Sequence, residues 1–384
     1  MAANRWGFLL LLSFIRVAMG IQYQSVAAAG PAIRDDLGLD YAGLGAITGS
    51  YMMLGAIFAL PAGFAGARFG DRRMLIAGLT VMVAGGVGIG LAPAFAPALF
   101  FRLFAGIGAV ILNIVISKMV MDRFEDATLG LAMGVLLGAW PLGIGLGSIF
   151  LPYLVEPLGW RGVMFFAAAC CAAFLALTIA AVPEGPKRAP GPLRFGLSGR
   201  TTAAVVAAGF VWLLGNAGYI ILLGFAPAFY VEQGMSLAAA GAVVSLASFA
   251  TIPVGPIGGW LGQRLPPMAL TALCMALTSA GIFILPGAAY PAITLFLIGA
   301  VLGLPSGLIV ALPARVLRPE QRAVGMGIFY SIFYAGLGLL PPFAGWVRDV
   351  TGAPHAPFTV AAAVNVSTLV AIGAFLLLAR RVVR

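Results

Sequence analysis

Long apolar runs are the feature that most restricts the fold of this chain. About twelve runs have the roughly 20 predominantly apolar residues that a helix needs to cross a bilayer. Since 62% of the residues are hydrophobic and only 9% are charged, the chain could not cover a water-facing surface. Barrel strands would show short alternating segments instead. The sequence therefore predicts an all-α integral membrane protein.

The predicted spans fall into two equal sets around one long polar linker, which is rich in Pro and Gly. We expect an N-terminal six-helix bundle over 1–183, a linker over 184–200 and a C-terminal six-helix bundle over 201–384. The expected spans are 6–29, 44–66, 74–93, 97–121, 128–154 and 162–182, then 201–229, 238–261, 268–287, 291–314, 323–346 and 356–379.

Basic residues are divided very unequally between the two sides of the predicted membrane. Of the 22 Lys and Arg residues, 17 lie on the side of the termini and of the linker, and three lie on the other side. The positive-inside rule therefore predicts cytoplasmic termini, in the inner membrane of a cell. This bias accounts for the net charge of +10 without a nucleic-acid partner. The two remaining arginines, Arg16 and Arg102, fall inside spans.

The two halves repeat one another. LPAGFAGARFGDRR (60–73) aligns with IPVGPIGGWLGQRL (252–265) at an offset of 192 residues, half the chain length. Duplication with six spans in each half is typical of transporters built from parallel repeats.

The loop after the second span resembles the signature loop of the major facilitator superfamily. The matching residues are Gly63, Arg68, Gly70, Arg72 and Arg73. The aspartate of the family pattern falls on Ala67, and we expect Asp71, one turn away, as its replacement. The resemblance implies that these residues form a gating loop.

The resemblance extends over essentially the whole chain and implies a definite architecture. Two six-helix bundles would enclose a central cavity that opens alternately to each side, lined by helices one, four, seven and ten. FRLFAGIGA (101–109) also resembles a pattern of helix four, and SKMVMDRFEDATLGLAMG (117–134) resembles the branches that carry nitrate, cyanate and organic anions. The antiporter signature of helix five is not cleanly present in GAWPLGIGLG (138–147).

Arg16 is the centre of a polar stripe on the first span. At 100° per residue, Ser13, Gly20, Tyr23 and Gln24 share its face, while Gln22 lies nearly opposite. Arg16 lies ~15 Å from the start of the helix, near the midplane of the bilayer. A guanidinium there is unfavourable by several kcal/mol unless it is paired or hydrated.

Several other side chains are candidates to face the same cavity. Arg102 shares a face with Asn113 on the fourth span. GPAIRDDLGL (30–39) resembles APAFYVEQGM (226–235) at an offset of 196 residues, and at this offset Trp212 is the repeat counterpart of Arg16. The predicted substrate-binding set is Arg16, Arg102, Tyr23, Gln24, Asn113, Trp212, Asn216, Tyr219, Ser306, Tyr330 and Tyr334. Pro305 also predicts a break in the tenth span.

None of the 12 acidic residues lies in the interior of a predicted span. The cavity would then be net positive, and the fork of an arginine suits carboxylate, nitrate or phosphate. We therefore predict a transporter of a small anion, either a monocarboxylate or an inorganic oxyanion. A structural role stays open for both arginines: helix carbonyls, Tyr23 or Gln24 could satisfy Arg16, and Arg102 matches a common family arginine.

Other functions fit the sequence less well. An exporter of hydrophobic or cationic drugs is the main alternative, because 14 methionines and many aromatic residues would suit an apolar pocket. An enzyme would need a nucleophile, an acid pair or a metal cluster, and none is evident, so we expect no cofactor and no metal. Cys170, Cys171 and Cys274 are expected in the core.

The mode of transport is left open by the residues. Coupling through a buried carboxylate is disfavoured, because no acid lies within the spans. Facilitated diffusion, anion exchange and symport remain alternatives. We expect a monomer in a lipid bilayer.

Overall fold

The computed structural model describes residues 5–124, 126–183, 197–318 and 321–383. Within these ranges the chain is helical and has no strand. The α-helices of the first half are α1 (Arg5–Ala28), α2 (Gly30–Leu37), α3 (Tyr41–Met53), α4 (Gly55–Phe69), α5 (Asp71–Gly90), α6 (Phe95–Met121) and α7 (Asp126–Ala181). Those of the second half are α8 (Gly199–Glu232), α9 (Leu237–Arg264), α10 (Pro267–Ile284), α11 (Pro291–Gly303), α12 (Ser306–Val310), α13 (Arg322–Thr351), α14 (Ala356–Val366) and α15 (Thr368–Val383). Two short 3₁₀ helices are η1 (Leu285–Gly287) and η2 (Pro313–Arg315).

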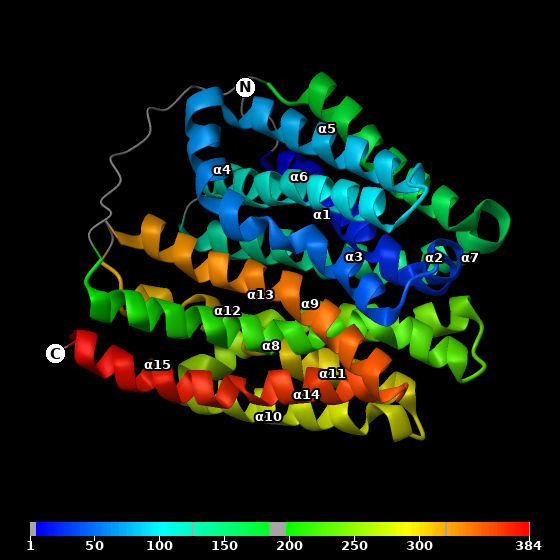
Figure 1. Ribbon diagram of the computed structural model, residues 1–384. Helices are drawn as coiled ribbons and strands as arrows, with labels where there is room; N and C mark the ends of the chain where they lie inside the picture. Colours follow the sequence, from blue (N-terminus) through cyan, green and yellow to red (C-terminus); the bar gives the residue numbers. More distant parts are fainter. Residues whose placement is uncertain (1–4, 125, 184–196, 319–320, 384) are drawn as a thin grey trace.

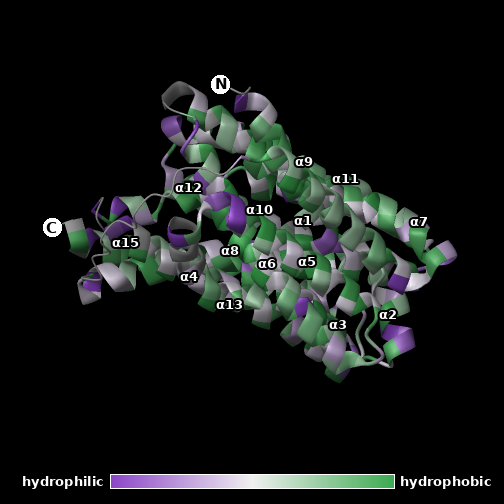
Figure 2. Ribbon diagram, turned by 90° about the horizontal axis from the view of Figure 1, so that it is seen from above, coloured by the Kyte–Doolittle hydropathy of each residue, from purple (hydrophilic) through white to green (hydrophobic). Residues whose placement is uncertain are grey.

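Eleven stretches of the described chain are long and apolar enough to cross a membrane. One of them, Leu131–Ala181, has 51 residues and contains a reversal at Gly159, where φ is 64°. It therefore makes two passes, which brings the number of spans to the predicted twelve. Figure 2 shows apolar colouring over most of the helix surfaces. The prediction of an all-α membrane protein is confirmed.

Local sequence signals explain where the helices begin, end and break. Asp40, Ser198 and Ser236 each cap a helix by accepting a backbone N–H three residues later. The second span is interrupted between α3 and α4, at Leu54. The tenth span breaks between α11 and α12 beside Pro305, as the sequence predicts.

The helices of the two halves occupy different parts of the molecule. In Figure 1 the helices of the first half lie in the upper part, and those of the second half lie below them. Within the first half, α1 and α6 pack against α7 and α5, respectively, and within the second half α8 packs against α14 and α15. The predicted boundaries at 183 and 200 stay a prediction, and 184–196 lies outside the described residues.

The halves meet along α3 and α13, and along α7 and α9. Gly45 and Gly49 allow α3 to approach the α13 backbone, because a Cβ on Gly49 would lie 2.8 Å from the Gly338 carbonyl oxygen. We call the end of the molecule that carries α2 the outer end, since the charge bias predicts that it faces outwards.

Charged groups join the halves at this outer end. The Glu232 carboxylate at the end of α8 accepts hydrogen bonds from Arg348 and from the Tyr41 hydroxyl, and it pairs with Arg34 at 3.8 Å. Asp349 accepts the Tyr41 backbone N–H at 3.0 Å and that of Ala42 at 2.8 Å. These contacts join the two halves at the outer end.

The close approach of α1 and α7 provides a test of this packing. A Cβ on Gly20 would lie 2.7 Å from the Trp140 carbonyl oxygen and 2.9 Å from Gly143 Cα. We expect Gly20→Ala to destabilise the protein by about 1–3 kcal/mol, because the two backbones must separate. Thermal unfolding in detergent measures this loss.

Gly134→Ala is the matched control, since nothing lies within 4 Å of a Cβ at that position. It should unfold at the wild-type temperature or slightly above, because alanine favours the helix. Equal melting temperatures for Gly20→Ala and the wild type would contradict the described packing.

Candidate functional site

Arg16 is a buried cation whose donors are not used by the protein. It lies on α1, its side chain is 8% exposed, and its Nε and Nη1 atoms are buried without a hydrogen-bond partner. No hydrogen bond or ion pair joins this guanidinium to any other part of the described chain. The hydroxyl of Ser13, one turn earlier, is also buried and unpaired. The polar stripe therefore leaves the charge of Arg16 unsatisfied.

Two side chains that interact electrostatically with Arg16 belong to α13, in the other half. Arg16 interacts with the phenol groups of Tyr330 and Tyr334. The Tyr334 hydroxyl accepts a hydrogen bond of 2.8 Å from Asn113 Nδ2 on α6. Its ring also fills the space beside Gly55, where a Cβ would overlap it. The structure thus brings four residues of the predicted set together across the two halves.

An aromatic surface continues from Tyr334 towards α8. The Tyr330 and Tyr334 rings stack with centroids 6.1 Å apart, and Phe333 lies 5.3 Å from Tyr334. The Trp212 ring follows at 5.5 Å from Phe333, and its indole Nε1 is buried without a partner. We call Trp212, Tyr330, Phe333 and Tyr334 the aromatic wall.

Phe333 was missed by sequence reasoning, which selected polar and amphipathic side chains only. Its position between Tyr330 and Tyr334 on one helix is the signal that could have found it.

Arg102 has the opposite environment to Arg16. It is fully buried, and its three nitrogens donate to three carbonyl oxygens: Nε to Ile47 at 3.3 Å, Nη1 to Gln22 at 2.9 Å and Nη2 to Tyr23 at 2.6 Å. The Tyr51 ring lies 4.5 Å from its guanidinium carbon. Arg102 therefore ties α6 to α1 and α3.

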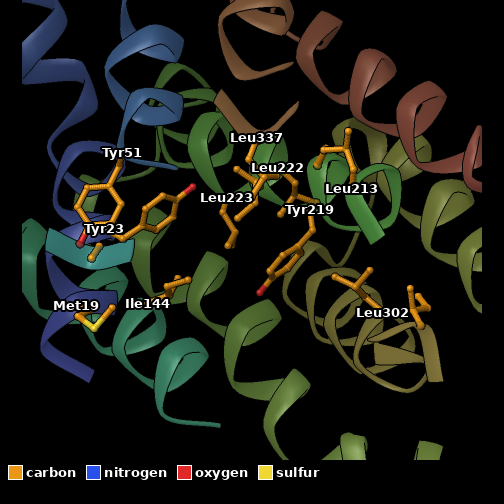
Figure 3. Packing of buried hydrophobic residues seen from close by; sticks show 14 of the residues in the cluster. Met19, Tyr23, Tyr51, Ile144, Leu213, Tyr219, Leu222, Leu223, Leu302 and Leu337 are labelled. Carbon is orange, nitrogen blue, oxygen red and sulfur yellow. The ribbon is translucent and has the colours of Figure 1, made fainter. Parts of the chain in front are cut away.

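Two predicted tyrosines lie on either side of the contact between the halves. Figure 3 shows Tyr23 of α1 and Tyr219 of α8 with Leu222 and Leu223 between them. The Tyr23 ring packs at 5.6 Å from both Tyr51 and Trp140, and the Tyr219 hydroxyl donates to Ser248 at 3.1 Å. Both side chains are buried parts of the core.

The other predicted residues lie apart from Arg16 or bond locally. Asn216 donates to the Trp212 carbonyl at 2.9 Å, and Ser306 donates to Gly303 at 2.8 Å. Gln24 lies two turns beyond Arg16, about 12 Å further along α1. Both polar atoms of its amide are buried without a partner, beside Gly147 of α7.

The predicted gating loop connects α4 to α5. Gly70 has φ of 91° and precedes Asp71, whose carboxylate accepts bonds of 2.7 and 2.8 Å from Lys118 at the end of α6. Arg72 Nε donates to the Val182 carbonyl at 2.6 Å. Asp71 thus holds the ion pair that the resemblance places one turn earlier.

The remaining residues of the predicted gating loop are Arg68, Arg73 and Gly63. Arg68 is exposed and lies 5.8 Å from the Phe69 ring centroid, and Arg73 is also exposed. Gly63 lies within α4, in a part whose side-chain surroundings are outside the description.

Comparison with known proteins identifies one family. The sequence profile of the Major Facilitator Superfamily matches residues 11–317. The crystal structure of a D-xylose-proton symporter has a TM-score of 0.79 with this chain at 12% identity, covering 96% of this chain and 97% of that one. The two share a fold.

Three curated relatives show which functions occur among similar chains. A cyanate transport protein of Escherichia coli is 26% identical over 90% of both chains. A probable nitrate/nitrite transporter of Mycobacterium tuberculosis is 25% identical over 91% of this chain and 89% of the relative. A tetracenomycin C resistance and export protein of Streptomyces glaucescens is 27% identical over 65% of this chain, which spans only 48% of that relative.

The two arginines can be separated experimentally by their effect on stability. Arg102→Lys keeps the charge but can replace at most part of the three hydrogen bonds. We expect a loss of about 2–4 kcal/mol in the free energy of unfolding, because carbonyls buried by the fold lose their donors. Denaturation in detergent, with the exposed Arg200→Lys as the matched control, measures this loss. Unchanged stability of Arg102→Lys would contradict a tie between helices.

Proposed function

Because the chain belongs to the major facilitator superfamily, we propose that it is a membrane transporter of a small anion that works by alternating access. The single observation that carries this proposal is the buried guanidinium of Arg16 without a protein partner.

The electrostatics of the site favour an anion as the missing partner. An arginine at the centre of a bilayer is unfavourable by about 2.5 kcal/mol or more. The described carboxylates lie near helix ends, in connections or, for Glu156, beside the reversal of α7 at Gly159, and none of them pairs with Arg16. An anion that enters the site would supply the opposite charge and accept the unused N–H groups.

The names of the relatives support both an anion and the main alternative. Cyanate and nitrate are small anions, and the two relatives named for them match about nine tenths of this chain. The export protein favours an exporter of hydrophobic or cationic compounds, but it matches a smaller share. The free positive charge of Arg16 repels cations, which makes a cationic substrate the weaker proposal.

The arrangement of the halves supports a rocking motion around Arg16. We assign the moving units to 1–183 and 201–384, joined by 184–200. The contacts of Glu232 and Asp349 hold the two halves together at the outer end, which favours exchange of substrate at the opposite end. In this proposal both termini are cytoplasmic, and the protein acts as a monomer in the inner membrane.

The proposal gives the two arginines different tasks. Arg16 binds the anion, while Arg102 keeps α1 in place through the carbonyls of Gln22 and Tyr23. Asn113 and Tyr334 hold the α13 side of the site against α6 by their hydrogen bond. Asp71 and Lys118 join α5 to the end of α6 in the gating loop.

Replacement of Arg16 tests the proposal directly. In proteoliposomes, we expect uptake of a panel of anions that includes nitrate, cyanate and acetate, and no uptake of neutral solutes. Arg16→Ala should abolish anion uptake, because the binding charge is lost. Arg16→Lys should also lose uptake, because a point charge does not reproduce the flat fork.

Arg200→Ala is the control, since it removes an exposed arginine at the start of α8. It should transport at the wild-type rate. Full anion uptake by Arg16→Ala would refute the role of Arg16. Drug resistance on overexpression, without any anion uptake, would favour the exporter instead.

A further inference from the structure

We propose that the substrate is a monocarboxylate with a flat apolar body, held by its carboxylate at Arg16 and by its body against the aromatic wall. This inference rests on the proposed function and narrows it from small anions in general to one chemical class. Three properties of the site carry it: its charge, the composition of its wall, and the placement of charge and wall on different halves of the chain.

The site has one unpaired positive charge, that of Arg16, which matches a substrate with a single negative charge. Arg102 donates to three carbonyl oxygens and is fully buried, so it adds no free donor beside Arg16. Lys118, the basic residue at the inner end of α6, is paired with Asp71 and Asp122. One unpaired guanidinium is neutralised by one carboxylate, whereas a dianion would bring a second charge that nothing near Arg16 offsets.

The surface opposite Arg16 is aromatic rather than polar. Tyr330 and Tyr334 lie within electrostatic range of the guanidinium, and Phe333 and Trp212 extend their rings into one continuous wall. The Tyr334 hydroxyl is already bonded to Asn113. Successive rings lie 5.3–6.4 Å apart, the separation at which aromatic groups attract one another.

The aromatic wall favours a monocarboxylate over an inorganic oxyanion. An inorganic oxyanion needs hydrogen-bond donors on every side, whereas the wall presents mainly ring faces, with the Trp212 indole Nε1 as its buried donor without a partner. A carboxylate places all its charge at one end, so the rest of the molecule can lie against the rings. The apolar body then gains the burial and ring contacts that nitrate cannot use.

The pseudo-symmetry of the chain places the two parts of the site opposite one another. Trp212 is the repeat counterpart of Arg16, and parallel repeats bring corresponding positions to either side of the central axis. The first half thus supplies the charge, and the second half supplies the aromatic surface. A substrate with one charged end and one apolar end would touch both halves.

Uptake by the full chain in proteoliposomes tests the inference with four labelled probes: benzoate, acetate, nitrate and the dianion phthalate. We expect benzoate to have a KM about tenfold below those of acetate and nitrate, the effect of one good ring contact. Phthalate should be a poor substrate. Arg16→Lys should lose uptake of every probe.

Variants of the aromatic wall test how much the rings contribute to the KM for benzoate, separately from the charge of Arg16. Trp212→Leu and Phe333→Leu should each raise the KM for benzoate several-fold, up to about tenfold, and leave acetate unchanged. Trp212→Phe keeps a ring and should stay near the wild type. Trp346→Leu is the matched control, because Trp346 is 53% exposed on the outside of α13.

The outcomes distinguish this inference from the function on which it rests. Arg16-dependent uptake of nitrate and acetate without a preference for benzoate would overturn the flat-body inference and leave anion transport intact. A preference for benzoate that survives both Leu variants would overturn the assignment of the wall. Uptake of none of the probes, or uptake independent of Arg16, would overturn both proposals.

Discussion

The proposed transport function rests on one uncompensated charge in the middle of a membrane-spanning helix. Arg16 is buried among the spans, and its Nε and Nη1 atoms have no partner. In a medium without water a charged guanidinium is strongly unfavourable, because it loses its hydration. A protein keeps such a group only where another interaction compensates for this loss. A substrate anion would neutralise Arg16 during the part of each transport cycle in which it is bound. The empty and the loaded site then differ in electrostatic free energy, which can bias the halves towards different arrangements.

Arg102 shows what a satisfied arginine in the same bilayer looks like. Its three nitrogens reach the carbonyl oxygens of Gln22, Tyr23 and Ile47, so charge-assisted hydrogen bonds replace the lost water. It has become part of the scaffold that fixes α1. The chain therefore uses one residue type for two purposes, and the difference lies in what surrounds each guanidinium.

Much of the fold could be predicted from the sequence because the bilayer limits the alternatives. Apolar run length gives the spans, and Pro305 gives the break between α11 and α12. The resemblance in the loop at Arg72 gives the family, which the profile match confirms. These signals are local in sequence, or repeat at a fixed offset, and therefore need no knowledge of tertiary contacts.

The candidate site was less predictable because it depends on contacts between distant helices. Helical spacing places Arg16 and Arg102 on polar faces, but it does not reveal that carbonyls of α1 and α3 receive Arg102. Gln24 shares the face of Arg16, but it lies two turns further along α1, beside α7. Phe333 has no polar group, so its sequence position alone does not mark it as a binding residue. The hydrogen bond from Asn113 of α6 to Tyr334 of α13, and the interaction of Arg16 with Tyr330 and Tyr334, show which of these side chains gather around the charge.

The thermal stability of Arg16→Met tests whether the buried guanidinium of Arg16 is unpaired, because this measurement does not require transport. In buffer with minimal small anions, the account predicts that Arg16→Met melts at a higher temperature than the wild type, since a buried uncompensated charge has been removed. Added nitrate or benzoate should then raise the melting temperature of the wild type but not that of the variant. A variant that is less stable than the wild type with and without these anions would show that the protein itself satisfies Arg16, and would contradict the account.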